Sequence, residues 1–310
     1  MNSPRIIFMG TPGFAVTSLD KLLQAGYDII GVVTAPDKPA GRGMHLTESA
    51  VKKYAAAHNL TILQPQKLKD DDFLNDLRSL KADLQIVVAF RMLPEVVWNM
   101  PPLGTINLHA SLLPQYRGAA PINWAIINGE KETGVTTFKL QHEIDTGNIL
   151  LAEKIKIGED ETAGELHDRM KEIGAGLLLK TVKKLSEGNL IPVPQSSLNA
   201  DTPLKHAAKI NTEMCKIDWQ KEVNDVFNFI RGLSPNPGAF TYLNGKKIKI
   251  FKAIKEVGES SAPSREFETD KKSYLKFACI NGHISITELQ LEGKKKIMID
   301  EFLRGFRFSS

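Results

Sequence analysis

Short apolar runs alternate with stretches of helical periodicity from the beginning of the chain. Arg5–Met9 is an apolar run that ends at the turn Gly10–Gly13. Leucines at helical spacing follow in Phe14–Leu23, and Asp28–Val33 is again strand-like. Strand, tight turn, helix and strand in this order predict a βαβ unit, the beginning of a parallel sheet. The turn reads Gly-x-x-Gly and lacks the Gly-x-Gly-x-x-Gly fingerprint, so we expect no nicotinamide cofactor.

The alternation continues to about residue 190 and predicts an α/β domain. The continuous apolar run Leu84–Phe90 is typical of a central parallel strand that is buried on both faces. The capping box Thr162–Glu165 begins a long helix, which Gly188 ends. Further helices are expected over Ser49–His58, Lys69–Leu80, Pro94–Trp98 and Ala120–Ile127, and further strands over Ile62–Leu63, Gly104–Leu108, Gly134–Leu140 and Ile149–Ile157.

The stretch Thr34–Thr47 interrupts this pattern with two prolines and two glycines. We expect it to be a loop without helix or strand, because proline removes a backbone donor and fixes φ. A loop of this length in a compact domain is usually functional or disordered. With Lys38 and Arg42 it is either an arm that presents cations to an anion or an ordinary surface loop, and its length does not decide between them.

A different pattern begins after the first part of the chain. Leu190–Lys205 carries three prolines and no periodicity, which predicts an extended linker. A helix over Asn224–Gly232 and then short strands separated by Asn-Gly and Glu-Gly turns predict a small β-barrel or sandwich. The strands are expected at Ala239–Leu243, Ile248–Ile254, Tyr274–Ile280 and Ile284–Leu291. We therefore expect domains over 1–189 and 206–310, joined by a linker over 190–205.

Composition agrees with a soluble protein, with 42% hydrophobic and 25% charged residues. No apolar run is long enough to span a bilayer, and the first one is too short for a signal peptide. The two cysteines, Cys215 and Cys279, do not make a disulfide framework. They favour reduced thiols in a cytoplasmic protein.

The uneven placement of charge suggests a partner for the second part of the chain. Residues 1–190 hold 21 Lys and Arg against 22 Asp and Glu, a net −1, and residues 191–310 hold 19 against 14, a net +5. An excess of positive charge favours a polyanionic partner, although a solvated basic surface is the plainer alternative. A small barrel with lysines on its turns is a common nucleic-acid-binding design.

Candidate chemistry is concentrated at the end of one expected strand. Asn107 and His109 are two residues apart, so on a strand their side chains point the same way. Asp145 arrives from a separate polar loop, Gln141–Asn148. The histidines and cysteines lack metal-ligand spacing, and the Gly-x-Ser-x-Gly motif of a serine nucleophile is missing from the sequence. A buried structural role for His109 is the alternative to a catalytic one.

Direct transfer between two bound substrates suits these three side chains. His109 can serve as acid or base near neutral pH, and Asn107 offers an NH₂ donor to an oxyanion. Asp145 can orient His109 and accept a proton. The set suits attack by an amine on an activated carbonyl through a tetrahedral intermediate.

These residues also carry a resemblance to a known family. Asn107–Ile122 and Asp145–Gly147 resemble the formyltransferases that use 10-formyltetrahydrofolate. Phe8–Ala15, Pro36–Gly43 and Ile230–Ala239 resemble the branch that formylates methionyl-tRNA. The resemblance implies a Rossmann-like, mostly parallel sheet domain followed by a small OB-like β-barrel domain. It implies transfer of a formyl group from N10 of the folate to the α-amine of initiator Met-tRNA, without a metal.

The resemblance also implies roles for individual residues. The catalytic set would be Asn107, His109 and Asp145; the folate site would comprise Ser111, Leu112, Leu113 and Pro114 with backbone at Val88, Ala89 and Phe90; and the tRNA contacts would be Lys38, Arg42 and Lys209. This chain departs from the family at two places. Gly13 stands where an acidic residue is usual, and Arg91–Pro94 is one residue shorter than the usual Gly-x-x-Leu-Pro.

Three other functions share part of this pattern. A formyltransferase with a small-molecule amine acceptor needs the Asn, His and Asp set but neither the arm nor the basic barrel. A formyl-folate hydrolase would use water as the acceptor. A nucleic-acid-binding protein could keep an inert folate-type domain, which an intact catalytic set argues against. We expect a cytoplasmic monomer with no membrane partner.

Overall fold

The computed structural model describes residues 3–40, 45–198, 203–258 and 267–308. The chain folds into two compact units. One comprises residues 1–117, 134–155 and 168–206, and the other comprises 118–133, 156–167 and 207–310. The short strands β8 (Arg117–Gly118) and β11 (His206–Ala207) lie where the chain passes from one unit to the other.

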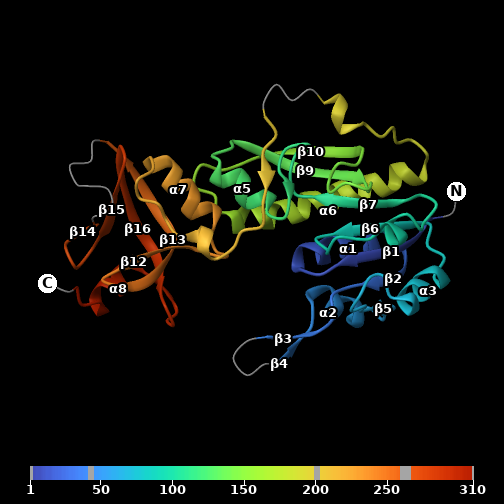
Figure 1. The fold of residues 1–310 in the computed structure, drawn as a ribbon, viewed down its shortest axis with the longest axis horizontal. Helices are drawn as coiled ribbons and strands as arrows, with labels where there is room; N and C mark the ends of the chain where they lie inside the picture. The colour runs from blue at the N-terminus through green and yellow to red at the C-terminus, as the bar shows by residue number, and fades with distance from the viewer. Residues whose placement is uncertain (1–2, 41–44, 199–202, 259–266, 309–310) are drawn as a thin grey trace. The chain divides into compact units, whose positions relative to one another are not determined.

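A seven-stranded sheet forms the centre of the first unit, in the order β10-β9-β7-β6-β1-β2-β5 (Figure 1). β1 pairs in parallel with β2 and β6, β2 with β5, and β6 with β7, whereas β9 joins β7 antiparallel. The strands are β1 (Arg5–Gly10), β2 (Asp28–Val33), β5 (Ile62–Leu63), β6 (Leu84–Val88), β7 (Thr105–His109), β9 (Glu132–Lys139) and β10 (Ile149–Lys156). This arrangement confirms the predicted Rossmann-like, mostly parallel sheet.

The strand order places a switch point between β1 and β6. From β1 the chain adds β2 and β5 on one side, and then returns to add β6 and β7 on the other. Open α/β sheets bind ligands outside the carboxyl ends of the strands at such a point. Gly10 is in register with Val88, and Val88 with Leu108, so these three strands end at one edge.

Local sequence explains the elements that cover this sheet. All residues of β6 are buried, as the unbroken apolar run predicts. In the capping box before α6, the Thr162 hydroxyl accepts from the Glu165 N–H (3.3 Å) and Glu165 Oε2 accepts from the Thr162 N–H (2.8 Å). The described α-helices before residue 190 are α1 (Gly13–Gln24), α2 (Ala50–Ala57), α3 (Asp71–Ser79), α4 (Glu95–Trp98), α5 (Pro121–Ile127) and α6 (Ala163–Ser186), of which α5 belongs to the second unit.

The prediction that Thr34–Thr47 contains no strand is wrong. β3 (Lys38–Ala40) and β4 (His45–Thr47) pair antiparallel, with Pro39 opposite Leu46. A two-stranded ribbon has only edge strands, where proline is tolerated because its missing N–H is not required. Arg42 lies outside the described residues.

Polar contacts hold the base of this β3–β4 hairpin. The Asp37 carboxylate pairs with the Lys52 ammonium on α2 and accepts from the Gln64 side chain at 2.9 Å. Gln64 Nε2 also donates to the Ala35 carbonyl at 2.9 Å. The Lys52–Asp37 bond is the main cause that lowers the pKa of Asp37 and raises that of Lys52. The Gln64 bond adds to the shift in the pKa of Asp37, and a bond to Glu48 adds to that of Lys52.

The second unit contains a curled antiparallel half-barrel, as the small-barrel prediction requires. Its strand order is β12-β13-β16-β15-β14, and β17 pairs with β16. The elements are β12 (Ala239–Leu243), β13 (Lys246–Val257), β14 (Phe267–Thr269), β15 (Leu275–Cys279), β16 (Gly282–Leu291), β17 (Lys296–Met298), α7 (Val223–Gly232), α8 (Ile299–Gly305) and the 3-10 turn η2 (Glu213–Cys215). Register shifts between Ile250 and Ala253 mark bulges, which bend a strand.

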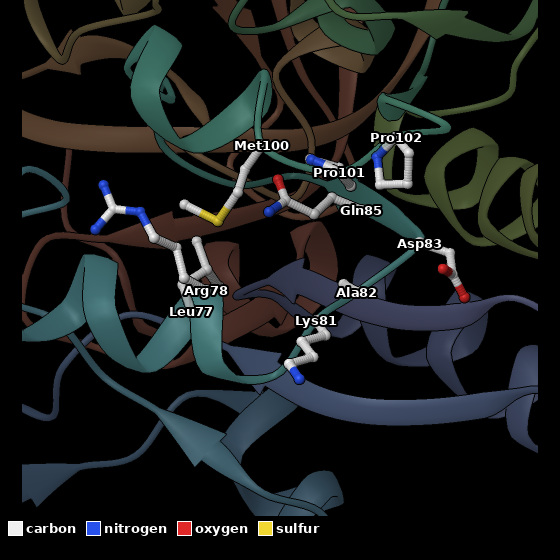
Figure 2. A pocket seen from close by; sticks show the side chains of 9 residues that line it. All are labelled: Leu77, Arg78, Lys81, Ala82, Asp83, Gln85, Met100, Pro101 and Pro102. Carbon is white, nitrogen blue, oxygen red and sulfur yellow. The ribbon is translucent and has the colours of Figure 1, made fainter.

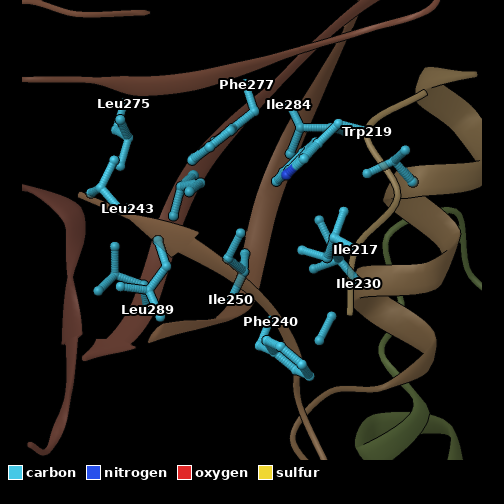
Figure 3. Packing of buried hydrophobic residues seen from close by; sticks show 14 of the residues in the cluster. Ile217, Trp219, Ile230, Phe240, Leu243, Ile250, Leu275, Phe277, Ile284 and Leu289 are labelled. Carbon is cyan, nitrogen blue, oxygen red and sulfur yellow. The ribbon is translucent and has the colours of Figure 1, made fainter. Parts of the chain in front are cut away.

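Aromatic stacking organises the core of this half-barrel (Figure 3). The Trp219 and Phe277 rings stack with centroids 4.3 Å apart, and the Trp219 indole N–H donates to the Thr241 hydroxyl at 3.0 Å. Cys215 and Cys279 are buried and unpaired, which confirms two free thiols. Burial raises the pKa of Cys279 to about 12. Among the described helices, none is long and apolar enough to cross a membrane.

Candidate active site

Asn107 and His109 occupy the end of β7, at the edge where β1 and β6 also end. Asn107 is half-buried beside Val87 of β6. His109 is opposite Thr136 of β9 and is 7% exposed. Their spacing of two residues sets both side chains on one face of the pleated strand. Strand pairing on both sides therefore fixes their positions.

Asp145 approaches His109 from the connection between β9 and β10. Its Oδ2 lies 4.0 Å from His109 Nδ1, and its backbone φ is +54°. That left-handed conformation is uncommon for a residue with a side chain and persists only where the surroundings enforce it. The structure therefore brings together two side chains that are far apart in the sequence.

The other ring nitrogen of His109 is held by the backbone. His109 Nε2 lies 2.9 Å from the Tyr116 carbonyl oxygen. A carbonyl only accepts, so Nε2 carries the hydrogen of this bond. In neutral His109 the lone pair then resides on Nδ1, the nitrogen that faces Asp145. Of the two ring nitrogens, Nδ1 is therefore the one that is not bonded to the backbone.

The segment after His109 is held by its own hydrogen bonds. The Ser111 hydroxyl is fully buried and donates to the Gln115 carbonyl at 2.6 Å. Thr136 on β9 donates to the Ser111 carbonyl at 2.7 Å and accepts from the Leu113 N–H at 3.2 Å. Leu113 is buried, whereas Leu112 and Pro114 are half-buried. Within the segment Ser111–Pro114, only Leu112 and Pro114 therefore expose appreciable side-chain surface. We call this segment, together with the end of β6, the wall of the site.

The end of β6 presents backbone at the same edge of the sheet. Val88 is buried, Ala89 is exposed with φ +47°, and Phe90 is half-buried. Arg91 then turns back and donates to the carbonyls of Pro65 and Gln66, the latter at 3.0 Å. Burial lowers the pKa of the Arg91 guanidinium. Arg91, where the sequence departs from the family pattern that it resembles, therefore joins the end of β6 to the segment after β5 through two hydrogen bonds.

Two of the three residues expected to contact nucleic acid lie among the described residues, and both are exposed. Lys38 is exposed on β3, and Lys209 is exposed in the second unit. No group of three or more potential metal-ligating side chains occurs among residues 3–40, 45–198, 203–258 and 267–308.

A surface hollow lies elsewhere in the first unit (Figure 2). Asp83 and Gln85 mark its place at the amino end of β6, the opposite end of that strand from Ala89. The Gln85 side chain is already engaged by the Thr105 hydroxyl at 3.0 Å. The hollow therefore lies at the amino end of β6, whereas His109 lies at the carboxyl end of β7.

Sequence reasoning missed one residue beside the site, Gln195. It lies in the 3-10 turn η1 (Gln195–Ser197), within the segment expected to be an extended linker, and it is 5% exposed. Its side chain donates to the carbonyls of Asp145 and Gly147, each at 2.8 Å. A glutamine among prolines and serines has no periodicity that would predict burial.

Comparison with known proteins identifies the family of the chain. The formyl transferase model matches residues 4–182, and the formyl transferase C-terminal domain model matches residues 209–307. The chain therefore belongs to the formyl transferase family. The relatives that the chain matches include proteins called methionyl-tRNA formyltransferase. The protein of that name from Bacteroides thetaiotaomicron is 52% identical over 310 residues, 98% of this chain and 96% of the relative. The one from Flavobacterium johnsoniae is 52% identical and is covered to 98%, with 100% of this chain.

More distant solved structures share the fold. The sugar 3N-formyl transferase WlaRD, in the presence of dTDP and 5-N-formyl-THF, has a TM-score of 0.68 at 21% identity, over 95% of this chain and 100% of that one. HypX from Aquifex aeolicus, in complex with tetrahydrofolic acid, has a TM-score of 0.65 at 19% identity. That match covers 99% of this chain and 49% of HypX. At these identities the likeness concerns the fold alone.

Proposed function

We propose that this chain transfers the formyl group of 10-formyltetrahydrofolate to the free α-amino group of methionine on initiator Met-tRNA. The observation that carries the proposal is the pairing of His109 Nδ1 with Asp145 at 4.0 Å, beside Asn107, at the switch-point edge of the sheet. Near-full-length identity of about half to relatives called methionyl-tRNA formyltransferase supports the choice of acceptor.

The reaction replaces one carbon–nitrogen bond with another. The amine nitrogen bonds to the formyl carbon, and the carbonyl π pair moves onto oxygen. As that pair returns, the bond from carbon to N10 breaks, and one amine proton ends on N10. Asn107 donates to the oxygen while it is negative. His109 Nδ1 carries the proton, since Nε2 is committed to Tyr116. Asp145 stabilises the protonated ring.

The donor fits the edge that the ends of β6 and β7 form. Exposed backbone at Ala89 offers donors and acceptors to a flat heterocycle, while Phe90 and the half-buried Leu112 and Pro114 offer apolar surface. Such a wall, apolar with a few fixed polar groups, is typical of small-molecule sites. We assign the pterin end of the donor to this wall, together with Val88, Ser111 and Leu113 as its buried support.

The acceptor would be held by cations outside this wall. We propose that Lys38 and Arg42 of the hairpin and Lys209 of the second unit contact tRNA phosphates. The net charge of +5 over residues 191–310 supports electrostatic binding of a polyanion. We further propose a catalytic domain over 1–189, a linker over 190–205 and a tRNA-binding domain over 206–310, in a cytoplasmic protein that acts as a monomer.

A formyl-transfer assay with competing acceptors tests the proposal. Labelled formyl from 10-formyltetrahydrofolate is offered to Met-tRNA, to glycinamide ribonucleotide and to an amino-sugar nucleotide, with release of formate followed in parallel. We expect label on Met-tRNA and very little elsewhere. Label on a small acceptor, or formate release as the main product, would overturn the assignment. Unacylated tRNA serves as the control, since it lacks the methionyl amine.

A further inference from the structure

Gln195 is a buried residue in an otherwise exposed segment. Its side chain is 5% exposed, whereas nearby Val193 and Leu198 are 39% and 40% exposed. The segment is held to the sheet by a bridge between Val193 and Ile149 of β10, with both backbone hydrogen bonds at 2.8 Å. That bridge brings Gln195 to the loop that precedes β10.

The amide of Gln195 is fully used. Nε2 donates to the Asp145 and Gly147 carbonyls, and Oε1 accepts from Arg117 Nε at 3.0 Å and from a terminal Arg117 nitrogen at 2.6 Å. Carbonyls only accept and a guanidinium only donates. The orientation of the amide therefore has one solution, and rotating it would break all four contacts.

These contacts join the two parts of the chain that hold His109. Arg117 directly follows Tyr116, whose carbonyl binds His109 Nε2. Asp145 faces His109 Nδ1. Gln195 thus connects the backbone on the Nε2 side of the ring to the loop on the Nδ1 side. The loop is tightly packed, since a Cβ on Gly147 would lie 1.7 Å from the Lys139 carbonyl oxygen.

We propose that Gln195 is a positioning residue for formyl transfer. It holds Asp145 in its left-handed conformation and sets the distance from the carboxylate to His109 Nδ1. The inference rests on the proposed function, because it acts through the proposed catalytic pair. A purely structural role, in which Gln195 only fastens the segment to the sheet, is the competing explanation.

Two substitutions separate these roles by kinetics. Gln195→Ala removes all four contacts. Gln195→Glu keeps the acceptor for Arg117 but replaces the two donors with a carboxylate that faces two carbonyls. We expect either change to lower kcat by about 10- to 100-fold, since small displacements of catalytic groups cost that much. KM for both substrates should change by less than about threefold, because Gln195 is buried and its amide is bonded to protein groups. Ser196→Ala, on the exposed neighbouring residue, should behave as wild type.

A double-mutant cycle shows whether the effect passes through Asp145. Gln195→Glu is made in wild type and in Asp145→Asn, and kcat is measured at high enzyme concentration. We expect a large loss in wild type and less than about a twofold further loss in Asp145→Asn, the non-additivity of groups that act together. Equal losses in both backgrounds, or kcat within about twofold of wild type for both Gln195 variants, would overturn the proposal.

The failure of this inference differs from failure of the proposed function. If wild type does not formylate Met-tRNA, the proposed function falls and this inference with it. If wild type is active and Asp145→Asn is not, but the Gln195 variants are unaffected, only this inference falls. Should Gln195→Ala fail to fold by circular dichroism, Gln195→Glu carries the test. If both fail to fold, the role of Gln195 is structural and the proposal is overturned.

Discussion

His109 Nδ1 lies 4.0 Å from Asp145 Oδ2, beyond hydrogen-bonding distance, while His109 Nε2 is bonded to the Tyr116 carbonyl at 2.9 Å. The ring is therefore fixed by a hydrogen bond at Nε2, while Nδ1 faces a carboxylate at a longer distance. If Nδ1 carries a proton, the ring and the carboxylate have opposite charges and attract each other. The proposed catalytic roles of His109 and Asp145 depend on this attraction.

Loss of either member of this pair should lower turnover sharply and spare folate binding. We expect Asp145→Asn and His109→Ala to lower kcat by about 100- to 1000-fold, the usual loss for a group that stabilises transition-state charge. Donor binding, followed by fluorescence titration, should change little. Asp72→Asn, on the exposed start of α3, removes the same charge away from the site and serves as control. Turnover near the wild-type rate in either variant would contradict the assignment.

The base of the β3–β4 hairpin should affect the use of tRNA but not the rate of the chemical step. Lys52→Met breaks the pairs that Lys52 makes with Asp37 and with Glu48 at 2.9 Å. We expect KM for Met-tRNA to rise about two- to fivefold, the range that a partly exposed ion pair can supply. Lys53→Met, on the next and exposed residue of α2, changes net charge equally. The hairpin base is unimportant for tRNA if both variants have the same KM.

Arg42 should contribute a single phosphate contact. Replacing it with alanine is expected to weaken Met-tRNA binding and to reduce the slope of log K against log salt by about 0.7–0.9, the value for one contact. Binding measured across a salt series gives that slope directly. Arg78→Ala, at the exposed end of α3, is the control for net charge. An unchanged slope for Arg42→Ala would mean that Arg42 makes no contact with a tRNA phosphate.

The capping box should make a stability contribution that depends on pH. Thr162→Ala is expected to lower the free energy of unfolding by about 1 kcal/mol. The pKa of Glu165 is lowered, first by the Thr162 N–H and then by the Thr162 hydroxyl. A carboxyl with a lowered folded pKa stabilises the fold above its unfolded pKa, about 4.3 for glutamate, and loses that effect as pH falls through the folded pKa.

The corresponding measurement uses Glu165→Ala in urea titrations. The stability gap between wild type and variant should be full at pH 7 and should narrow as pH falls below about 4. Glu161→Ala, just before the helix, is not a neutral control because Glu161 accepts from the Gly158 N–H at 2.9 Å. Glu159→Ala, on an exposed residue before the helix, is preferable. A gap that stays constant over this range would mean that ionised Glu165 is not responsible.

Elements defined by neighbouring residues were predictable from the sequence. The buried strand β6 and the Thr162–Glu165 cap depend on local patterns, and both are confirmed. The β3–β4 hairpin does not follow from the local pattern, because proline argues against the interior of a sheet, whereas both strands of a ribbon are edges. Isolated ribbons depend on contacts at their base, such as Lys52 with Asp37, which no local pattern encodes.

The candidate site was predictable only in part for a similar reason. Asn107 and His109 share a strand, so their common face follows from spacing. The approach of Asp145 was suggested by its polar loop and by the resemblance to a family. Gln195 makes contacts across 48 and 50 positions of sequence, through a segment without periodicity. A contact of that span depends on how the segment returns to β10.

The return of residues 193–195 to β10 limits where the chain can be shortened. The formyl transferase model ends at residue 182, and all seven strands of the sheet precede that point. The contacts of Gln195 with the carbonyls of Asp145 and Gly147 are therefore made by a residue that follows every strand of the sheet in sequence. A chain cut at residue 182 would contain all seven strands and lack the residue that joins the Asp145 loop to Arg117.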